Sequence, residues 1–519
     1  MSRNQSSVSV SGVILITSLV INALIIRSSY INQTNNWLLV VSVPILAIVI
    51  YNINQKQHAI LRNYPLIGYL RYIFESIRPE MRQYFFESDA DGKPFNRRQR
   101  SIVYQRAKNV KQTVAFGMQV DPNQVGFEWM AHSIYPVQIE NKSLRVTIGN
   151  YQSKMPYNAS ILNIGAMSFG ALSKTAITSL NQGAQLGNFA HNTGEGGISP
   201  YHLMGGDLIW QIGTGYFGCR DQAGNFDELL FEKNAQRKQV KMIELKLSQG
   251  AKPGHGGILP AAKNTPEISE IRNVPVNTTI ISSPGHKAFQ DANGLICFLG
   301  KLRNLSGGKP VGFKICIGNK QEFHDICQQI KITGIIPDFI TIDGSEGGTG
   351  AAPLEFTDNV GMPLLEALSF VSLTLKRFGL KENIKIIAAG KIISGFDILK
   401  VMALGADSCY SARGMMFSMG CIQALRRDSG KCPVGIATQE ESLYKGLDVS
   451  DKKVRVASFH KNTINAVVEL MESSGFKQLK DINAAKFFRR INQLDTKSFQ
   501  EIYLSDNISL PIHSVTHLN

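Results

Sequence analysis

The sequence lacks the cysteine pairs of a disulfide scaffold. Its 519 residues contain seven cysteines, an odd number, scattered between Cys219 and Cys432 without a paired framework. Disulfide scaffolds use even numbers of closely spaced cysteines in oxidising compartments, so this pattern indicates a reducing compartment. The chain also lacks a repeat at any fixed period. Its length allows two to four domains or one barrel with additions, since domains usually have roughly 100 to 200 residues.

An interleaved basic and aromatic motif of the nucleic-acid-binding kind is also missing, although the formal net charge is +15. Twelve lysines and arginines against five acidic residues fall between Lys56 and Lys111, about seven of the fifteen excess charges. This stretch follows a hydrophobic N-terminus. We therefore expect it to lie against anionic lipid, and we do not expect nucleic acid as a partner.

Two apolar runs near the N-terminus, Val13–Ile26 and Trp37–Ile53, are separated by the polar linker Ser28–Asn36. With their flanks, each approaches the roughly 17–25 residues that cross a bilayer. A signal peptide is the alternative for the first run, but no small-x-small cleavage site follows it. We expect a transmembrane helical hairpin, with both termini and the domain that follows the hairpin on the cytoplasmic face of the membrane. The cations that indicate this orientation follow the second run, at Lys56, Arg62, Arg71 and Arg78.

From Ser160 onward, short apolar runs that end in glycine alternate with segments of helical periodicity. Eight strand-helix units predict an α/β fold, a (β/α)8 TIM barrel, whose sites lie on the loops after the strands. We expect the domains to be a membrane hairpin at 1–55, a basic connecting region at 56–150, the barrel at 151–439 and a C-terminal helical region at 440–519. The predicted strands are Ile161–Ala166, Asn188–Asn192, Met242–Leu247, Thr278–Ser282, Val311–Ile317, Asp338–Asp343, Ile384–Ala389 and Asp407–Ser411.

Two further segments carry predictions of their own. The stretch Ser199–Lys241 is too long for an ordinary loop, so we expect an insertion that covers one mouth of the barrel. Helical patterns at Asn462–Met471 and Asp481–Asn492 predict the C-terminal helices.

Glycine clusters recur after five predicted strands, most densely in the stretch Asp338–Gly350, DFITIDGSEGGTG. Glycine lets successive backbone amides approach one anion, so a ligand laid across the barrel mouth is indicated. Phosphate sites in barrels commonly use the loops after the seventh and eighth strands. The alternative is a set of helix caps with a solvated lysine and arginine. The candidate phosphate ligands are Gly390, Lys391, Arg413 and Gly414.

Several motifs carry a family resemblance: NIGAMSFGALS, HNTGEGGISPYHL, IELKLSQGAKPGHGGILP, DFITIDGSEGGTGAAP, LGADSCYSARGMM and CPVGIATQ. They resemble the FMN-binding synthase domain of glutamate synthase, in its stand-alone membrane-associated form, from about Tyr64 to Glu469. The resemblance implies an FMN-dependent oxidoreductase acting on a CH–NH2 group, which reduces 2-iminoglutarate, formed from 2-oxoglutarate and ammonia, to L-glutamate.

The resemblance also implies roles for individual residues. Lys314 is expected at the N1/O2 edge of the flavin, where a cation stabilises the negative charge of the reduced ring. The alternative for a lysine inside a barrel strand is a pair with a core carboxylate. Glu195, Lys246 and Gln249 are expected to face the substrate, with Lys246 on a carboxylate; the alternative is a solvated loop-end cluster. The expected cofactor-binding set is Ala166, Met167, Ser168, Lys314, Gly344, Gly347, Gly348, Gly390, Lys391, Arg413 and Gly414.

The sequence departs from the family where three cysteines bind a three-iron four-sulfur cluster. Cys421 and Cys432 occupy the outer positions, but Arg427 stands in the middle one. A guanidinium has no lone pair to give to iron, so the cluster is doubtful. This departure motivates a second hypothesis, a membrane-anchored regulatory or assembly protein that keeps the flavin fold without turnover.

Two other functions of the family, glutamine hydrolysis and the binding of a dinucleotide electron donor, are not expected from these residues. We expect no glutaminase domain before the barrel. No G-x-G-x-x-G fingerprint follows a predicted strand and opens a helix, so the electron donor is unassigned.

Overall fold

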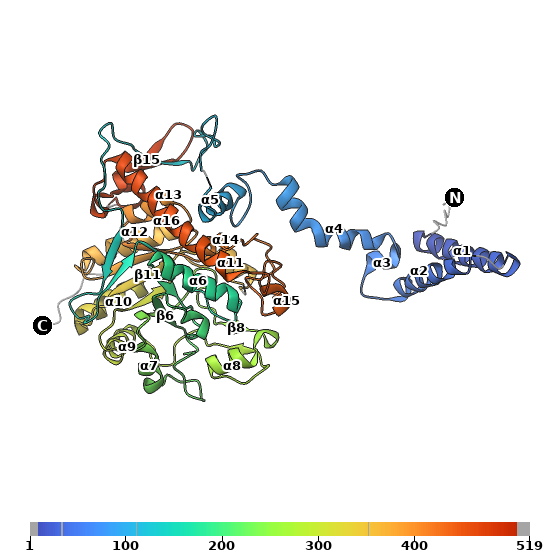
Figure 1. Cartoon of the computed structure of the whole chain (residues 1–519), viewed down its shortest axis with the longest axis horizontal. Helices are drawn as coiled ribbons and strands as arrows, with labels where there is room; N and C mark the ends of the chain where they lie inside the picture. The colour runs from blue at the N-terminus through green and yellow to red at the C-terminus, as the bar shows by residue number, and fades with distance from the viewer. Residues whose placement is uncertain (1–8, 33–34, 111, 351, 506–519) are drawn as a thin grey trace, which may run out of the picture. The chain divides into compact units, whose positions relative to one another are not determined.

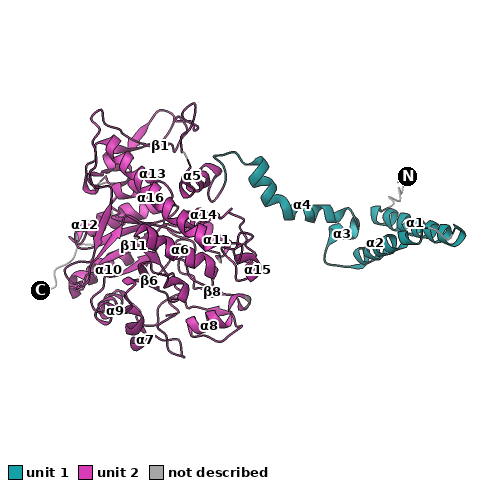
Figure 2. Ribbon diagram, viewed as in Figure 1, with its two compact units in different colours: residues 1–92 teal, residues 93–519 magenta. Residues whose placement is uncertain are grey.

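The computed structural model describes residues 9–32, 35–110, 112–350 and 352–505. The chain divides into two compact units, residues 1–92 and 93–519 (Figures 1 and 2). The boundary between them falls inside the stretch expected to be a connecting region, at 56–150. Each unit has its own packing and is described separately.

The first unit contains two helices that are long and apolar enough to cross a membrane, α1 (Val10–Asn32) and α2 (Trp37–Asn54). The Asn22 side chain joins them, since its amide accepts a 2.9 Å hydrogen bond from Ser42 Oγ and donates to the Ser42 carbonyl oxygen at 3.3 Å. Polar side chains of this kind commonly link helices in an apolar setting.

The helix α4 (Gly68–Met81) follows the short α3 (Ala59–Asn63) and runs into a π-helical turn at Arg82–Phe86. Its apolar side chains recur every three or four residues and therefore share one face. They are 38% to 63% exposed. Arg71 and Arg78 flank this face, and Glu75 and Glu80 balance their charge, so α4 is amphipathic without a net charge. The exposed apolar residues are Leu70, Ile73, Phe74, Ile77 and Met81.

The second unit is built on a closed barrel of eight parallel strands, which confirms the predicted fold class. The strands are short and apolar, and each is buried on both faces as parallel strands between helices are. Neighbours pair in the order β4 (Leu162–Ile164), β5 (His191–Asn192), β6 (Leu208–Ile212), β7 (Val240–Lys246), β10 (Val311–Ile315), β11 (Phe339–Asp343), β12 (Lys385–Ala389) and β13 (Ser408–Ser411), which closes on β4.

Helices surround the barrel (Figure 1). Side-chain oxygens at their N-termini accept backbone N–H bonds, as Ser173 does before α6 and Ser394 before α13. The helices of this unit are α5 (Arg97–Ala107), α6 (Lys174–Gly187), α7 (Glu228–Ala235), α8 (Pro266–Arg272), α9 (Ala292–Leu305), α10 (Lys320–Thr333), α11 (Leu354–Asn359), α12 (Leu364–Arg377), α13 (Gly395–Ala403), α14 (Arg413–Ser418), α15 (Glu441–Tyr444), α16 (Val449–Ser474) and α17 (Phe499–Tyr503).

One predicted barrel strand is wrong. Thr278–Ser282 contributes only β9 (Ile280–Ile281), which pairs with β8 (Ile258–Leu259) outside the barrel, with Ile281 74% exposed. The third barrel strand is β6, inside the stretch predicted to be an insertion at Ser199–Lys241. Periodicity does not separate short apolar runs of these two kinds. The long excursion lies instead between β7 and β10, residues 247–310, and carries α8 and α9.

The predicted helix at Asp481–Asn492 is also wrong. This segment forms β14 (Phe487–Arg490), which pairs with β1 (Glu128–Met130) and β15 (Thr496–Ser498) in an antiparallel sheet. Phe488 stacks on Trp129 at 5.5 Å between ring centroids. Such cross-strand aromatic pairs stabilise a sheet, and they outweigh the local helical pattern.

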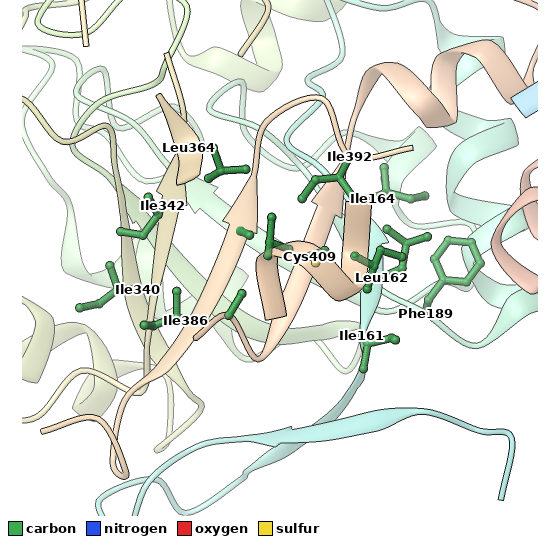
Figure 3. Packing of buried hydrophobic residues seen from close by; sticks show 14 of the residues in the cluster. Ile161, Leu162, Ile164, Phe189, Ile340, Ile342, Leu364, Ile386, Ile392 and Cys409 are labelled. Atoms are coloured by element: carbon green, nitrogen blue, oxygen red, sulfur yellow. The ribbon is translucent and has the colours of Figure 1, made fainter. Parts of the chain in front are cut away.

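The main hydrophobic core lies between the barrel strands and the helices around them. Figure 3 shows part of it, with Ile340, Ile342 and Ile386 on neighbouring strands. A second cluster fills the inside of the barrel near the strand N-termini, where the hairpin of β2 (Arg145–Ile148) and β3 (Tyr157–Ser160) packs against it. Because this end is filled with apolar side chains, the polar side chains inside the barrel gather toward the strand C-termini.

The start of β11 is fixed by the buried carboxylate of Asp338. It accepts hydrogen bonds from the backbone N–H groups of Asn150 and Val311, both at 2.8 Å, and pairs with Arg303 of α9 at 3.0 Å. The Arg303 and Asp338 side chains are 6% and 0% exposed.

Replacing Arg303 with methionine should lower the free energy of unfolding by about 3–5 kcal/mol, because it leaves a buried carboxylate without its cation. The exposed Lys301 on the same helix is the matched control. It pairs with Glu228 at 2.6 Å, so Lys301→Met should cost about 0–1 kcal/mol. Thermal unfolding of the full chain measures both, and equal losses would contradict the role given to Asp338.

Candidate functional site

Two adjoining cavities open at the C-terminal ends of the barrel strands. The first cavity, of about 650 Å³ counting space open to solvent, is lined by residues from Phe95 to Gly414 around the ends of β10 to β13. The second cavity, of about 1340 Å³ on the same measure, lies toward β8, β9 and α8. The two cavities share five lining residues: Ala166, Gln249, Gly348, Ala412 and Arg413.

Most of the residues predicted to bind a cofactor or substrate line these cavities. Lys314, Gly347, Gly390, Lys391 and Gly414 line the first cavity only. Gly344 lines neither: its carbonyl accepts the N–H of Gly347 at 2.9 Å beneath the glycine loop. The predicted residues that line the second cavity are Ala166, Met167, Ser168, Glu195, Lys246, Gln249, Gly348 and Arg413.

Lys314 and Asp343 form a buried ion pair at the inner end of the first cavity, with 2.9 Å between Nζ and Oδ2. Both side chains are about one-tenth exposed. Burial opposes the charged lysine, but Asp343 and Glu244 outweigh it and raise the pKa of Lys314 above its ordinary value. The sequence suggested a pair with a core carboxylate as the alternative to a flavin role for Lys314, and that pair is present. Because the paired Lys314 is charged and still lines the cavity, the ion pair is compatible with a flavin role.

Beneath this pair, the carboxylate of Glu244 is fully buried inside the barrel. It accepts hydrogen bonds from Asn192 at 2.7 Å, Gln211 at 2.6 Å and Thr341 at 2.6 Å. The three donors and Glu244 lie on four different strands. Their hydrogen bonds compensate the cost of burying the carboxyl group. The floor of the cavity is thus a polar, hydrogen-bonded network, and Glu244 acts with Asp343 to raise the pKa of Lys314.

At the other end of the first cavity lie Gly390, Lys391 and Arg413. Lys391 has a left-handed backbone, with φ of 48°, which is uncommon for a residue with a side chain and marks local strain. Arg413 donates to the Glu346 carbonyl oxygen at 2.6 Å and lies over the Phe95 ring. A Cβ on Gly348 would come within 2.9 Å of the Arg413 guanidinium, so a side chain there would displace Arg413.

These features suit a ligand that carries a phosphate at one end and a polar ring edge at the other, as FMN does. Two cations and exposed glycine backbone at one end can bind the phosphate, while Lys314 at the other can meet the polar edge of a flavin ring. Burial and the nearby Arg413 lower the pKa of Lys391, which is the sign of a cation held without a full countercharge. An anionic ligand would relieve that repulsion.

In the second cavity, Glu195 and Lys246 form an ion pair at 2.8 Å. Burial alone would raise the pKa of Glu195, but Lys246, Lys252 and Arg272 together hold it below its ordinary value. Glu195 is therefore ionised at neutral pH. Lys246, expected to bind a substrate carboxylate, already has an internal carboxylate partner.

Two further cations of this cavity escaped the sequence reasoning. Arg272 of α8 is 6% exposed, and its Nε has no hydrogen-bond partner, although another guanidinium nitrogen donates to the Phe169 carbonyl at 3.1 Å. Lys252 is 4% exposed and donates to the Gly256 carbonyl at 2.8 Å. Both belong to the excursion after β7, where a barrel strand had been predicted at Thr278–Ser282. The signal was the lysine inside the glycine cluster SQGAKPGHGG.

The residues around Cys421 and Cys432 do not fit an iron–sulfur cluster. Burial raises the pKa of the Cys421 thiol to about 11. The third position holds Arg427, which cannot donate to iron. Among the residues that the structure describes, no group of three or more His, Cys, Asp or Glu side chains is placed to hold a metal ion.

Comparison with known proteins gives concordant results. The model of the conserved region in glutamate synthase matches residues 128–477. The glutamate synthase large subunit-like protein YerD of Bacillus subtilis is 36% identical over 514 residues, covering 90% of this chain and 96% of YerD. The archaeal glutamate synthase (NADPH) of Methanocaldococcus jannaschii is 33% identical over 364 residues, covering 70% of this chain and 67% of that protein.

Solved structures with similar folds are more distant. A mutant flavocytochrome b2 with pyruvate bound has a TM-score of 0.44 and 11% identity, covering 86% of this chain and 92% of the other. A Pediococcus acidilactici lactate oxidase has a TM-score of 0.41 and 12% identity, covering 79% and 92%. The barrel assignment stands on the strand pairing itself.

Replacing Lys314 with methionine should reduce the flavin content of the purified protein at least tenfold, because the cavity loses its inner cation and Asp343 becomes an unpaired charge beside the ring. Absorbance of the flavin released on denaturation measures this. The matched control is Lys331→Met, which changes an exposed lysine on α10 and should leave flavin content unchanged. Full flavin content in Lys314→Met would remove Lys314 from the cofactor site.

Proposed function

We propose that this chain, which belongs to the glutamate synthase family, is an FMN-dependent oxidoreductase that makes L-glutamate from 2-oxoglutarate and ammonia by way of 2-iminoglutarate. The observation that carries the proposal is that two cavities share a wall. A cavity suited to a flavin adjoins a second cavity lined by cations, so a bound cofactor and an anionic substrate would meet at Ala166 and Gln249.

In the first cavity, we assign the phosphate to Gly390, Lys391, Arg413 and Gly414, and the polar edge of the ring to Lys314. When bound, FMN would supply a hydride to the imino carbon. The backbone at Ala166, Met167 and Ser168 would lie along the ring. Lys314 is held by Asp343 and raised in pKa, so it stays charged and favours the reduced, more negative form of the cofactor.

In the second cavity, we assign the carboxylate next to the reacting carbon to Lys252 and Arg272, which are both buried; the Nε of Arg272 has no hydrogen-bond partner. Glu195 is ionised, and its negative charge favours a cationic iminium nitrogen over a neutral keto oxygen. Lys246 would keep Glu195 in position through their 2.8 Å ion pair, while Gln249, which lines both cavities, would hydrogen-bond to the substrate. These residues bind and orient the substrate, which is the main contribution of a protein to cofactor chemistry.

For the first unit, we propose that α1 and α2 span the cytoplasmic membrane and that α4 lies at its surface. The support is the length and hydropathy of the two helices, together with the exposed apolar face of α4 and its flanking arginines. Such a helix binds anionic lipid by burying its apolar side. The excess of cations after α2 favours the cytoplasmic side for the catalytic unit.

The enzymatic proposal is tested with the full chain in detergent. Its flavin is reduced anaerobically by an artificial donor, and 2-oxoglutarate with ammonium is then added. We expect reoxidation of the flavin with one L-glutamate formed per flavin, and neither compound alone should reoxidise it. A flavin that stays reduced in the presence of both would instead support a regulatory or assembly protein that keeps the fold without turnover.

The membrane proposal predicts that the full chain stays in the membrane pellet after alkaline carbonate extraction. Carbonate strips proteins held by charge alone, whereas two spanning helices remain. Quantitative release into the supernatant would refute the hairpin. The variant Phe74→Glu tests the role of α4. It should stay in the membrane pellet, because the hairpin is intact, but the chain should bind anionic vesicles more weakly if α4 lies at the membrane surface.

A further inference from the structure

Arg427 occupies a place in the wall of the second cavity that nothing so far explains. It lies in the segment between Cys421 and Cys432, and it lines the second cavity but not the first. Its side chain packs against the glycine loop: a Cβ on Gly350 would lie 2.5 Å from Arg427 Cγ. The absence of a side chain at Gly350 therefore creates the room that Arg427 fills.

A lysine from the excursion after β7 holds this segment in place. Lys263 Nζ donates a 2.6 Å hydrogen bond to the backbone carbonyl oxygen of Arg427, and Lys263 also lines the cavity. Burial and the positive charge of Arg427 lower the pKa of Lys263, with Asp428 opposing. Two cations thus lie together on the part of the cavity that is not shared with the flavin site.

The charges in the cavity wall are unbalanced. Two carboxylates, Glu195 and Asp428, face a larger number of cations, and Glu195 is already paired with one of them. Within the described residues, Arg427 forms no ion pair; burial lowers its pKa and only the Cys421 and Cys432 thiols oppose that shift. The unpartnered Nε of Arg272 is a second, independent sign that a ligand completes this cavity. The cations in the wall are Lys246, Lys252, Lys263, Arg272, Arg413 and Arg427.

We propose that Arg427, supported by Lys263, forms a second anion-binding subsite of the second cavity, which takes the distal carboxylate of a dicarboxylate substrate. The position that would otherwise serve a metal cluster serves substrate selection in this chain. The subsite rests on the proposed function for its substrate, because the first carboxylate is assigned to Lys252 and Arg272. A guanidinium suits the task, since it binds a carboxylate through two parallel hydrogen bonds.

The test compares two ligands that differ only in the distal group, 2-oxoglutarate and 2-oxobutyrate, by isothermal titration calorimetry on the flavin-loaded full chain in detergent. Arg427→Gln should weaken 2-oxoglutarate binding roughly tenfold or more, the usual loss for a charged hydrogen bond. It should change 2-oxobutyrate binding less than about twofold, because that ligand has no distal carboxylate. Arg427→Lys should recover part of the loss.

Two further variants make the result decisive. Arg426→Gln changes the neighbouring, exposed arginine, which does not line the cavity, and should bind both ligands as the wild type does. Lys263→Gln should also weaken 2-oxoglutarate selectively, and it decides the matter if Arg427→Gln fails to fold, as judged from flavin content and thermal unfolding.

Equal loss of both ligands in Arg427→Gln, or no loss of either, would overturn the subsite, as would stoichiometric iron and sulfide in the wild-type protein. The outcome is separable from that of the proposed function. Turnover with an unchanged KM for 2-oxoglutarate in Arg427→Gln would refute the subsite alone. Selective loss of 2-oxoglutarate binding in a protein without turnover would refute the enzymatic proposal and leave the subsite standing.

Discussion

The buried ion pair of Lys314 and Asp343 is the interaction on which the site depends. The barrel interior changes character along its axis, from apolar side chains such as Met242 and Phe339 near the strand N-termini, through the hydrogen-bonded carboxylate of Glu244, to this pair at the open end. Because strand residues alternate in direction, the same alternation that buries Ile340 and Ile342 against the helices turns Thr341 and Asp343 inward. The electrostatics of the cavity therefore follow from the strand register.

The glycine loop after β11 connects the end of this strand to the walls of the two cavities. Asp343 ends the strand and receives the N–H of Gly250 at 3.1 Å, which ties the loop after β7 to the loop after β11. Gly348 makes room for Arg413, which lines both cavities, and Gly350 makes room for Arg427, which lines the second. Since neighbouring positions of one loop admit the two arginines, the cofactor and substrate sites are built together, and changes to this loop would affect both.

The sequence predicted the barrel, and most of the candidate site residues that it indicated line the cavities, because glycine clusters after apolar strands reflect a local requirement of the backbone. It failed where tertiary context decides. β6 was missed because its short apolar run does not differ locally from Thr278–Ser282, and Arg272 was missed because it is brought to the cavity by an excursion of some sixty residues, 247–310. The ion-pair partners of Lys314 and Lys246 lie on other strands or loops. The sequence could therefore suggest that Lys314 has a carboxylate partner, but it could not identify which residue that partner is.

The central claim is that the first cavity holds FMN with a charged lysine at the polar edge of its ring. The most direct measurement is the absorption spectrum of the flavin carried by the purified full-length protein, recorded during anaerobic reduction at neutral pH. The account predicts that the protein carries one FMN per chain and that the fully reduced flavin is the anion, stabilised by Lys314. A colourless protein that does not take up added FMN, or a reduced flavin that is neutral, would contradict it.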